Sequence, residues 1–139
     1  MKRLTPALRK FFEEQEILRL AYLDDDQPRA LPLWFVTIGG IHYISTGTKT
    51  KKWKAIQKYP EVGWVIDAGK QGKYKGVSMY GKAEAVTDQK LRARIYRTFG
   101  KKYFGRTDHP KQLEIWGEVD DPETVFIHLN ATDGFWWEY

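Results

Sequence analysis

Hydroxyl and lysine side chains gather in one short stretch of the chain, from residue 45 to residue 52. From Tyr43 to Pro60 the sequence reads Tyr-Ile-Ser-Thr-Gly-Thr-Lys-Thr-Lys-Lys-Trp-Lys-Ala-Ile-Gln-Lys-Tyr-Pro, which predicts a strand, a hydroxyl-rich loop and a short helix. The start of a helix carries unpaired N–H groups and partial positive charge, so it disfavours nearby cations and favours a bound anion. Lys51 and Lys52 at this start therefore indicate a phosphate site, with a solvated basic turn as the alternative.

The other groups capable of acid–base or metal chemistry are scattered along the chain. His42, His109 and His128 belong to different predicted elements, and none has a partner at the spacing of a metal site or a catalytic triad. The carboxylates of residues 24–26 form a predicted turn without a second acidic cluster. We expect no metal site and no hydrolytic chemistry, and any enzymatic step then depends on a cofactor.

Length and composition predict one domain, residues 1–139, and 42% hydrophobic residues are enough for a substantial core. The absence of cysteine excludes disulfides and thiolate metal sites. A net charge of +5 favours anionic partners without choosing among phosphorylated cofactors, nucleic acid and acidic surfaces. The first residues contain no apolar run that predicts a signal peptide or a membrane span, so we expect a cytoplasmic protein without a membrane partner.

Hydrophobic periodicity and turn residues predict a mainly β chain with helices between the strands. The predicted strands cover residues 17–23, 30–38, 41–46, 62–67, 77–86, 124–130 and 135–139. The predicted helices cover residues 5–14, 51–59 and 88–102, with a shorter one from Pro110, and residues 69–76 form a predicted Gly/Lys loop. Such a small domain favours a closed, mostly antiparallel barrel with helices packed outside.

Four segments occur in a recognisable order: Leu20-Ala-Tyr-Leu-Asp, Pro28-Arg-Ala-Leu-Pro-Leu-Trp-Phe-Val, the run from Tyr43 to Val62, and Gly76-Val-Ser-Met-Tyr-Gly-Lys-Ala-Glu-Ala-Val. Together they resemble the pyridoxamine 5'-phosphate oxidase-like family of flavin-binding split barrels. The resemblance covers nearly the whole chain and implies a mostly antiparallel split β-barrel that binds FMN.

The resemblance also implies roles for individual residues. In members of the family, a segment like Arg29-Ala-Leu-Pro lies along the flavin ring and ribityl chain, and hydroxyl groups at the end of the third strand lie near the cofactor. Two neighbouring basic residues bind the phosphate, and the fifth strand lies beside the ring. The implied cofactor-binding residues are Arg29, Ala30, Leu31, Pro32, Ser45, Thr46, Thr50, Lys51, Lys52 and Gly76.

The sequence departs from the family at two places. Family phosphate loops often have Arg before the Lys, whereas Lys51 holds phosphate as a point charge, so we expect more salt-sensitive binding. The chain ends Asp-Gly-Phe-Trp-Trp-Glu-Tyr, without the basic segment containing Arg and His that binds the vitamin substrate in the true oxidases. That substrate is therefore not expected here.

The resemblance implies a homodimer with FMN at the subunit interface, acting by hydride transfer on an unidentified small molecule. Trp136 and Trp137 are adjacent on a predicted strand, so one is expected to fill the core and the other to meet the partner. The deazaflavin coenzyme is the alternative cofactor, and its longer anionic tail would need a longer groove lined by Lys49, Lys70, Lys73 and Lys75. Haem is a third and weaker candidate ligand.

A different class of function is also open, because lysine-rich loops and aromatic side chains are typical of barrels that bind single-stranded nucleic acid. The compact group of hydroxyls and lysines at one helix start suits a single phosphate better than a backbone track, so nucleic acid is the weaker hypothesis.

Overall fold

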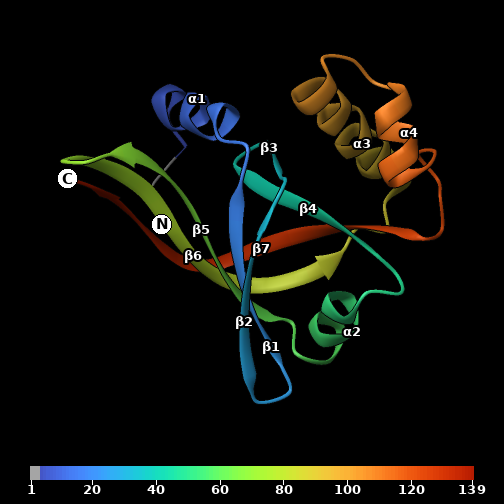
Figure 1. Cartoon of the computed structure of the whole chain (residues 1–139), viewed down its shortest axis with the longest axis horizontal. Coiled ribbons are helices and arrows are strands. Elements are labelled where there is room, and N and C mark those ends of the chain that lie inside the picture. Colours follow the sequence, from blue (N-terminus) through green and yellow to red (C-terminus); the bar gives the residue numbers. More distant parts are fainter. Residues whose placement is uncertain (1–3) are drawn as a thin grey trace.

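The computed structural model describes residues 4–139 and consists of strands and four helices (Figure 1). The strands are β1 (Leu18–Asp24), β2 (Gln27–Leu33), β3 (Val36–Ile38), β4 (Ile41–Gly47), β5 (Glu61–Lys70), β6 (Lys73–Ala85) and β7 (Thr124–Glu138). The helices are α1 (Pro6–Glu14), α2 (Lys51–Lys58), α3 (Gln89–Phe104) and α4 (Pro110–Trp116). The strands form one sheet in the order β2-β1-β5-β6-β7-β4-β3.

Every strand pair in this sheet is antiparallel, which confirms the predicted fold class. The prediction of a closed barrel was wrong, because the edge strands β2 and β3 do not pair with each other within residues 4–139. The strand expected over residues 30–38 is interrupted at Phe35, whose N–H and carbonyl lie 2.9 and 2.8 Å from the hydroxyl of Tyr103. These bonds take the place of the hydrogen bonds that a neighbouring strand would make to Phe35. The segment therefore forms two strands, β2 and β3, which lie at opposite edges of the sheet.

Two other predicted boundaries were wrong. The Gly/Lys loop over residues 69–76 is a tight hairpin in which β5 runs to Lys70 and β6 begins at Lys73, with Gly72 at φ +83° in the turn. The strands expected at residues 124–130 and 135–139 are one strand, β7, because a register shift at Tyr80/Gly81 lets pairing continue past the irregular residues.

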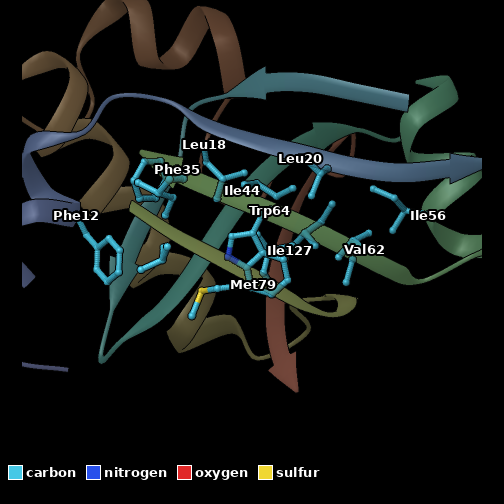
Figure 2. Packing of buried hydrophobic residues seen from close by; sticks show 14 of the residues in the cluster. Phe12, Leu18, Leu20, Phe35, Ile44, Ile56, Val62, Trp64, Met79 and Ile127 are labelled. Atoms are coloured by element: carbon cyan, nitrogen blue, oxygen red, sulfur yellow. The ribbon is translucent and has the colours of Figure 1, made fainter. Parts of the chain in front are cut away.

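The inner face of the curved sheet holds the main core. Leu18, Leu20, Ile44 and Trp64 contribute side chains that are at most 2% exposed (Figure 2). Leu8, Phe11 and Phe12 on α1 pack against the same core, as does Ile56 on α2. The spacing of these apolar residues therefore docks each short helix on the sheet.

A second core lies between α3 and the opposite face of β3, β4 and β7. It contains Val36 and Tyr43 from the strands with Ile95 and Phe99 from the helix. Residues of β4 thus alternate between two cores, which fixes the direction of every side chain along this strand. The predicted site residues Ser45 and Thr46, near the end of β4, therefore point to opposite faces of the sheet.

His42 lies on β4 and is buried in the main core, with 1% of its surface exposed. Its Nδ1 is 2.8 Å from the hydroxyl of Thr37, and its ring meets the rings of Phe12 and Phe35 edge-on. Burial, with a smaller effect from the charge of Lys102, lowers the pKa of His42 from 6.5 to about 3. The folded protein therefore holds a neutral imidazole.

We predict that His42 makes the protein acid-sensitive. The unfolded histidine takes up a proton as the pH falls through 6.5, while folded His42 stays neutral down to about pH 3, so stability is lost across this window. Relative to His42→Gln, the wild-type free energy of unfolding should fall by about 2 kcal/mol between pH 8 and pH 5. Urea unfolding at both pH values measures this difference.

His128→Gln is the matched control, because His128 is only partly buried on β7. It should keep the wild-type pH dependence. A wild-type minus His42→Gln difference that does not change with pH would contradict the assignment.

Candidate functional site

The junction between β4 and α2 is organised by the hydroxyl of Thr50. Its Oγ1 accepts a hydrogen bond of 3.1 Å from the N–H of Trp53, which makes Thr50 the N-cap of α2. The same oxygen lies 2.9 Å from the carbonyl of Gly47 and 2.9 Å from Oγ1 of Thr46. Of the two threonines that precede this helix in the sequence, Thr48 and Thr50, it is Thr50 that caps α2, and it links the helix start to the last residues of β4.

Lys51 and Lys52 occupy the first turn of α2, directly after this cap. Neither forms an ion pair within residues 4–139, whereas Lys49 lies 3.4 Å from Glu123 and Lys58 lies 2.9 Å from Asp25. Burial lowers the pKa of Lys52, because the surroundings of its ammonium group provide less water to solvate the charge. A cation in the first turn of a helix lowers helix stability by about 0.3–1 kcal/mol. A dianion bound at the same place makes the interaction with these cations favourable. The residues present thus fit a phosphate group, and we call Thr46, Thr50, Lys51 and Lys52 the lysine cradle.

Ser45 lies on the opposite face of β4 from Thr46. Its Oγ accepts a hydrogen bond of 2.8 Å from Nε1 of Trp116 on α4. Between β4 and α4 is a cavity of about 480 Å³ whose lining includes the carboxylates Asp121 and Glu123. Thr46 and Gly47 line the same cavity, so this lining does not separate Ser45 from the residues at the start of α2, and the predicted role of Ser45 in cofactor binding stays a prediction.

The predicted segment Arg29 to Pro32 lies on β2, an edge strand that pairs with β1. Pro32 has no N–H for a ladder bond, and an edge position is where proline is tolerated in a sheet. Ala30 and Pro32 alternate with Arg29 and Leu31 along the strand, so the segment divides between the two faces of the sheet. Arg29 lies 3.7 Å from Asp24 and borders a cavity of about 490 Å³.

Gly76 is the fourth residue of β6, where the sequence had indicated the end of a loop. A Cβ built on this residue would lie 2.6 Å from Cζ2 of Trp137 and 2.7 Å from the carbonyl oxygen of Ile66. The glycine therefore lets the indole of Trp137 lie against the strand. This packing accounts for the residue within a single chain, and its predicted approach to a flavin ring stays a prediction.

Arg92 on α3 is a structural residue of the site that sequence reasoning missed. Its guanidinium donates hydrogen bonds of 2.6, 2.8 and 2.9 Å to the carbonyls of Val119, Asp121 and Thr124. The guanidinium also lies over the ring of Phe126, 5.0 Å from its centroid. Arg92 thereby fixes the segment that carries the carboxylates beside β4, and nothing in the sequence distinguishes it from the other arginines.

No group of three His, Cys, Asp or Glu side chains suited to a metal ion occurs in the described part of the chain. Among residues 4–139, no helix has both the length and the apolar character needed to cross a membrane.

We predict that Arg92→Lys lowers the free energy of unfolding by about 1–3 kcal/mol, because one ammonium cannot replace a planar fork that bonds three carbonyls. Urea unfolding measures the effect. Arg97→Lys, an exposed change on the same helix, is the control and should alter stability by less than about 0.5 kcal/mol. Equal effects of the two substitutions would show that the three hydrogen bonds contribute little.

Comparisons with known proteins agree with this fold. A conserved hypothetical protein from Mycobacterium tuberculosis, Rv2991, is 24% identical, with a TM-score of 0.81 and coverage of 98% of this chain and 86% of that one. An FAD-binding protein from Mesorhizobium loti is 21% identical, with a TM-score of 0.69 and coverage of 98% and 96%. The heme storage protein HutZ from Vibrio cholerae is 17% identical, with a TM-score of 0.72 and coverage of 96% and 94%.

No curated protein matches this sequence. The family model described as pyridoxamine 5'-phosphate oxidase, however, matches residues 4–137, which is nearly the whole chain. The chain therefore belongs to the pyridoxamine 5'-phosphate oxidase family.

Proposed function

We propose that this protein is an FMN-binding oxidoreductase that transfers hydride between its flavin and a small molecule. The observation that carries the proposal is the lysine cradle, where two lysines that form no ion pair with any described residue stand at a capped helix start in a chain of this family. The similar FAD-binding protein supports a flavin, while the similar heme storage protein shows that the fold alone does not decide the ligand.

In this proposal the protein's own groups bind and position. Lys51 and Lys52 neutralise the phosphate, and the free N–H groups at the start of α2 offer further hydrogen bonds to it. Thr46 and Thr50 hold the helix start in place, because their hydroxyls bond to each other and to the backbone. When bound, the flavin supplies the redox chemistry by accepting or donating hydride.

The positions of the other lysines favour FMN over the deazaflavin coenzyme, whose longer anionic tail needs an extended basic groove. Lys49 is paired with Glu123, and Lys70 and Lys73 face each other at the tip of the β5–β6 hairpin. Lys75 lies over the ring of Phe11, 5.3 Å from its centroid. Lys70, Lys73 and Lys75 belong to β5 and β6, away from the start of α2, and the neighbouring Lys49 already has a carboxylate partner. This arrangement favours a compact anion site that matches one terminal phosphate.

We further propose that two chains pair through the outer face of β1, β5, β6 and β7. The exposed fractions of Leu23, Tyr80 and Phe135 on this face are 40%, 49% and 54%. The sheet register places Ala30 and Pro32 of β2 on the same face. A partner seated there would cover an apolar surface and lie beside the segment expected to pass the flavin.

The two C-terminal tryptophans accord with this arrangement. Trp136 packs against the main core, 5.4 Å from the ring of Phe11 between centroids, while Trp137 lies on the outer face beside Gly76. One indole thus fills the core and the other is available to the proposed partner.

We predict that Lys52→Ala weakens FMN binding by about 1.5–3 kcal/mol, roughly 10–150-fold in affinity, which is the usual worth of a charge-assisted hydrogen bond. Titration monitored by flavin fluorescence measures it. The fold should persist, because the side chain is only partly buried at the surface.

Lys54→Ala is the matched control, since Lys54 is exposed one position beyond Trp53 on the same helix. It should leave the affinity within a factor of about two, because Lys54 is two residues from Lys52 and its side chain therefore lies about 200° around the helix from that of Lys52. If both Lys51→Ala and Lys52→Ala bind FMN as the wild type does, the lysine cradle is not the phosphate site.

We also predict that the protein sediments at micromolar concentration with twice its chain mass of 16.3 kDa. Tyr80→Glu should dissociate the dimer, because it buries a charge in the apolar interface. Ile115→Glu, at a residue of α4 that is 52% exposed and lies away from this face, should not. A monomeric wild type with cofactor bound would refute the interface.

A further inference from the structure

A third cavity lies at the end of the sheet that α1 covers. Its volume is about 370 Å³, and α1, the β3–β4 turn, β6 and β7 all contribute to its wall. We call it the α1 cavity. Among residues 4–139 its lining carries no charged side chain and includes Leu8, Phe12, Ile41, Val77, Met79 and Trp136. The volume is within the range of small-molecule sites, and these apolar side chains disfavour an ion.

Two buried nitrogen atoms lie next to this lining. Nε1 of Trp64 and Nε2 of His42 have no hydrogen-bond partner within residues 4–139, although the side chains are 2% and 1% exposed. A buried donor without a partner costs about 1–3 kcal/mol, which a hydrogen-bonding ligand can recover. Both nitrogens therefore mark a place where a polar group would be stabilised.

The geometry relates these atoms to the α1 cavity. Trp64 pairs with Met79 across β5 and β6, so the two side chains share the inner face. Figure 2 shows the indole nitrogen on the side of its ring that faces Met79 and Phe12, which both line the cavity. The ring of His42 is 4.6 Å from that of Phe12 between centroids. Neither Trp64 nor His42 lines the cavity itself, and Met79 stands between the cavity and the indole. Because methionine is unbranched and has three rotatable side-chain bonds, a change of the Met79 rotamer would bring a bound molecule to the indole N–H.

The α1 cavity is separate from the lysine cradle. The cradle lies at the start of α2, whereas α1 covers a distant part of the sheet (Figure 1). None of the cradle residues lines the α1 cavity. The two sites also differ in chemistry, because one presents cations and the other an apolar wall with a buried donor behind it.

We propose that the α1 cavity binds an uncharged, mainly apolar molecule of one or two rings that carries a hydrogen-bond acceptor such as a ketone. The indole N–H of Trp64 can only donate, so it selects an acceptor. The uncharged lining selects against carboxylates, phosphates and ammonium groups. This site is independent of the flavin proposal and adds a second ligand to the protein.

The test uses 1-tetralone, a bicyclic ketone, and tetralin, the corresponding hydrocarbon without the oxygen. In ¹⁵N-labelled protein the indole N–H signal of Trp64 is identified by its loss in Trp64→Phe. Added 1-tetralone should move this signal downfield in a saturable way, because the N–H gains an acceptor. Tetralin should not produce that downfield shift. A Trp64 signal that 1-tetralone leaves unchanged up to millimolar concentration, or that both compounds shift alike, would overturn the proposal.

Leu8→Phe fills the α1 cavity from α1 and should weaken 1-tetralone binding at least tenfold. Leu113→Phe makes the same change at a residue of α4 that is 40% exposed, and should leave binding unchanged. Equal binding by Leu8→Phe would place the ligand elsewhere and reject the proposal. If Leu8→Phe does not fold, nuclear Overhauser contacts in the wild type decide: contacts from 1-tetralone to the methyls of Val77 and Met79 support the site, and their absence rejects it.

Discussion

The position of the Thr50 hydroxyl determines where α2 begins and therefore where Lys51 and Lys52 lie. It caps α2 and lies within hydrogen-bond distance of Thr46 and Gly47, so the helix begins at a fixed point after β4. Lys51 and Lys52 consequently stand in the first turn, where the helix dipole opposes them and no described carboxylate pairs with them. This is a local electrostatic strain that a phosphate would relieve, and it motivates the functional proposal.

Local signals in the sequence predicted the helices well, because caps and apolar spacing involve neighbouring residues. Asp88 is the N-cap of α3, as its position before an apolar run indicates, and Thr50 is the one of two candidate threonines, Thr48 and Thr50, that caps α2. The interruption at Phe35 could not be predicted, because its backbone bonds to Tyr103, a residue 68 positions away. The hairpin within residues 69–76 was missed for another reason: glycine and lysine are also typical of loops.

For the candidate site, too, the sequence predicted what lies close together along the chain and missed contacts between distant residues. The sequence placed Thr46, Thr50, Lys51 and Lys52 together, because they belong to one strand–helix junction. It also grouped Ser45 with them, and in the structure Ser45 accepts a hydrogen bond from Trp116 and lines the same cavity as Thr46. The contribution of Arg92 was hidden for a physical reason, since its three acceptors are backbone carbonyls that leave no pattern in the sequence.

The central claim is that the start of α2 recognises a phosphate, and comparison of FMN with riboflavin tests it most directly. The two ligands share the ring and ribityl chain and differ in the terminal phosphate. Calorimetric titration of the wild-type protein at physiological salt should give at least tenfold tighter binding for FMN, about 1.4 kcal/mol. Equal affinity for FMN and riboflavin, or no binding of either at high micromolar concentration, would contradict the account.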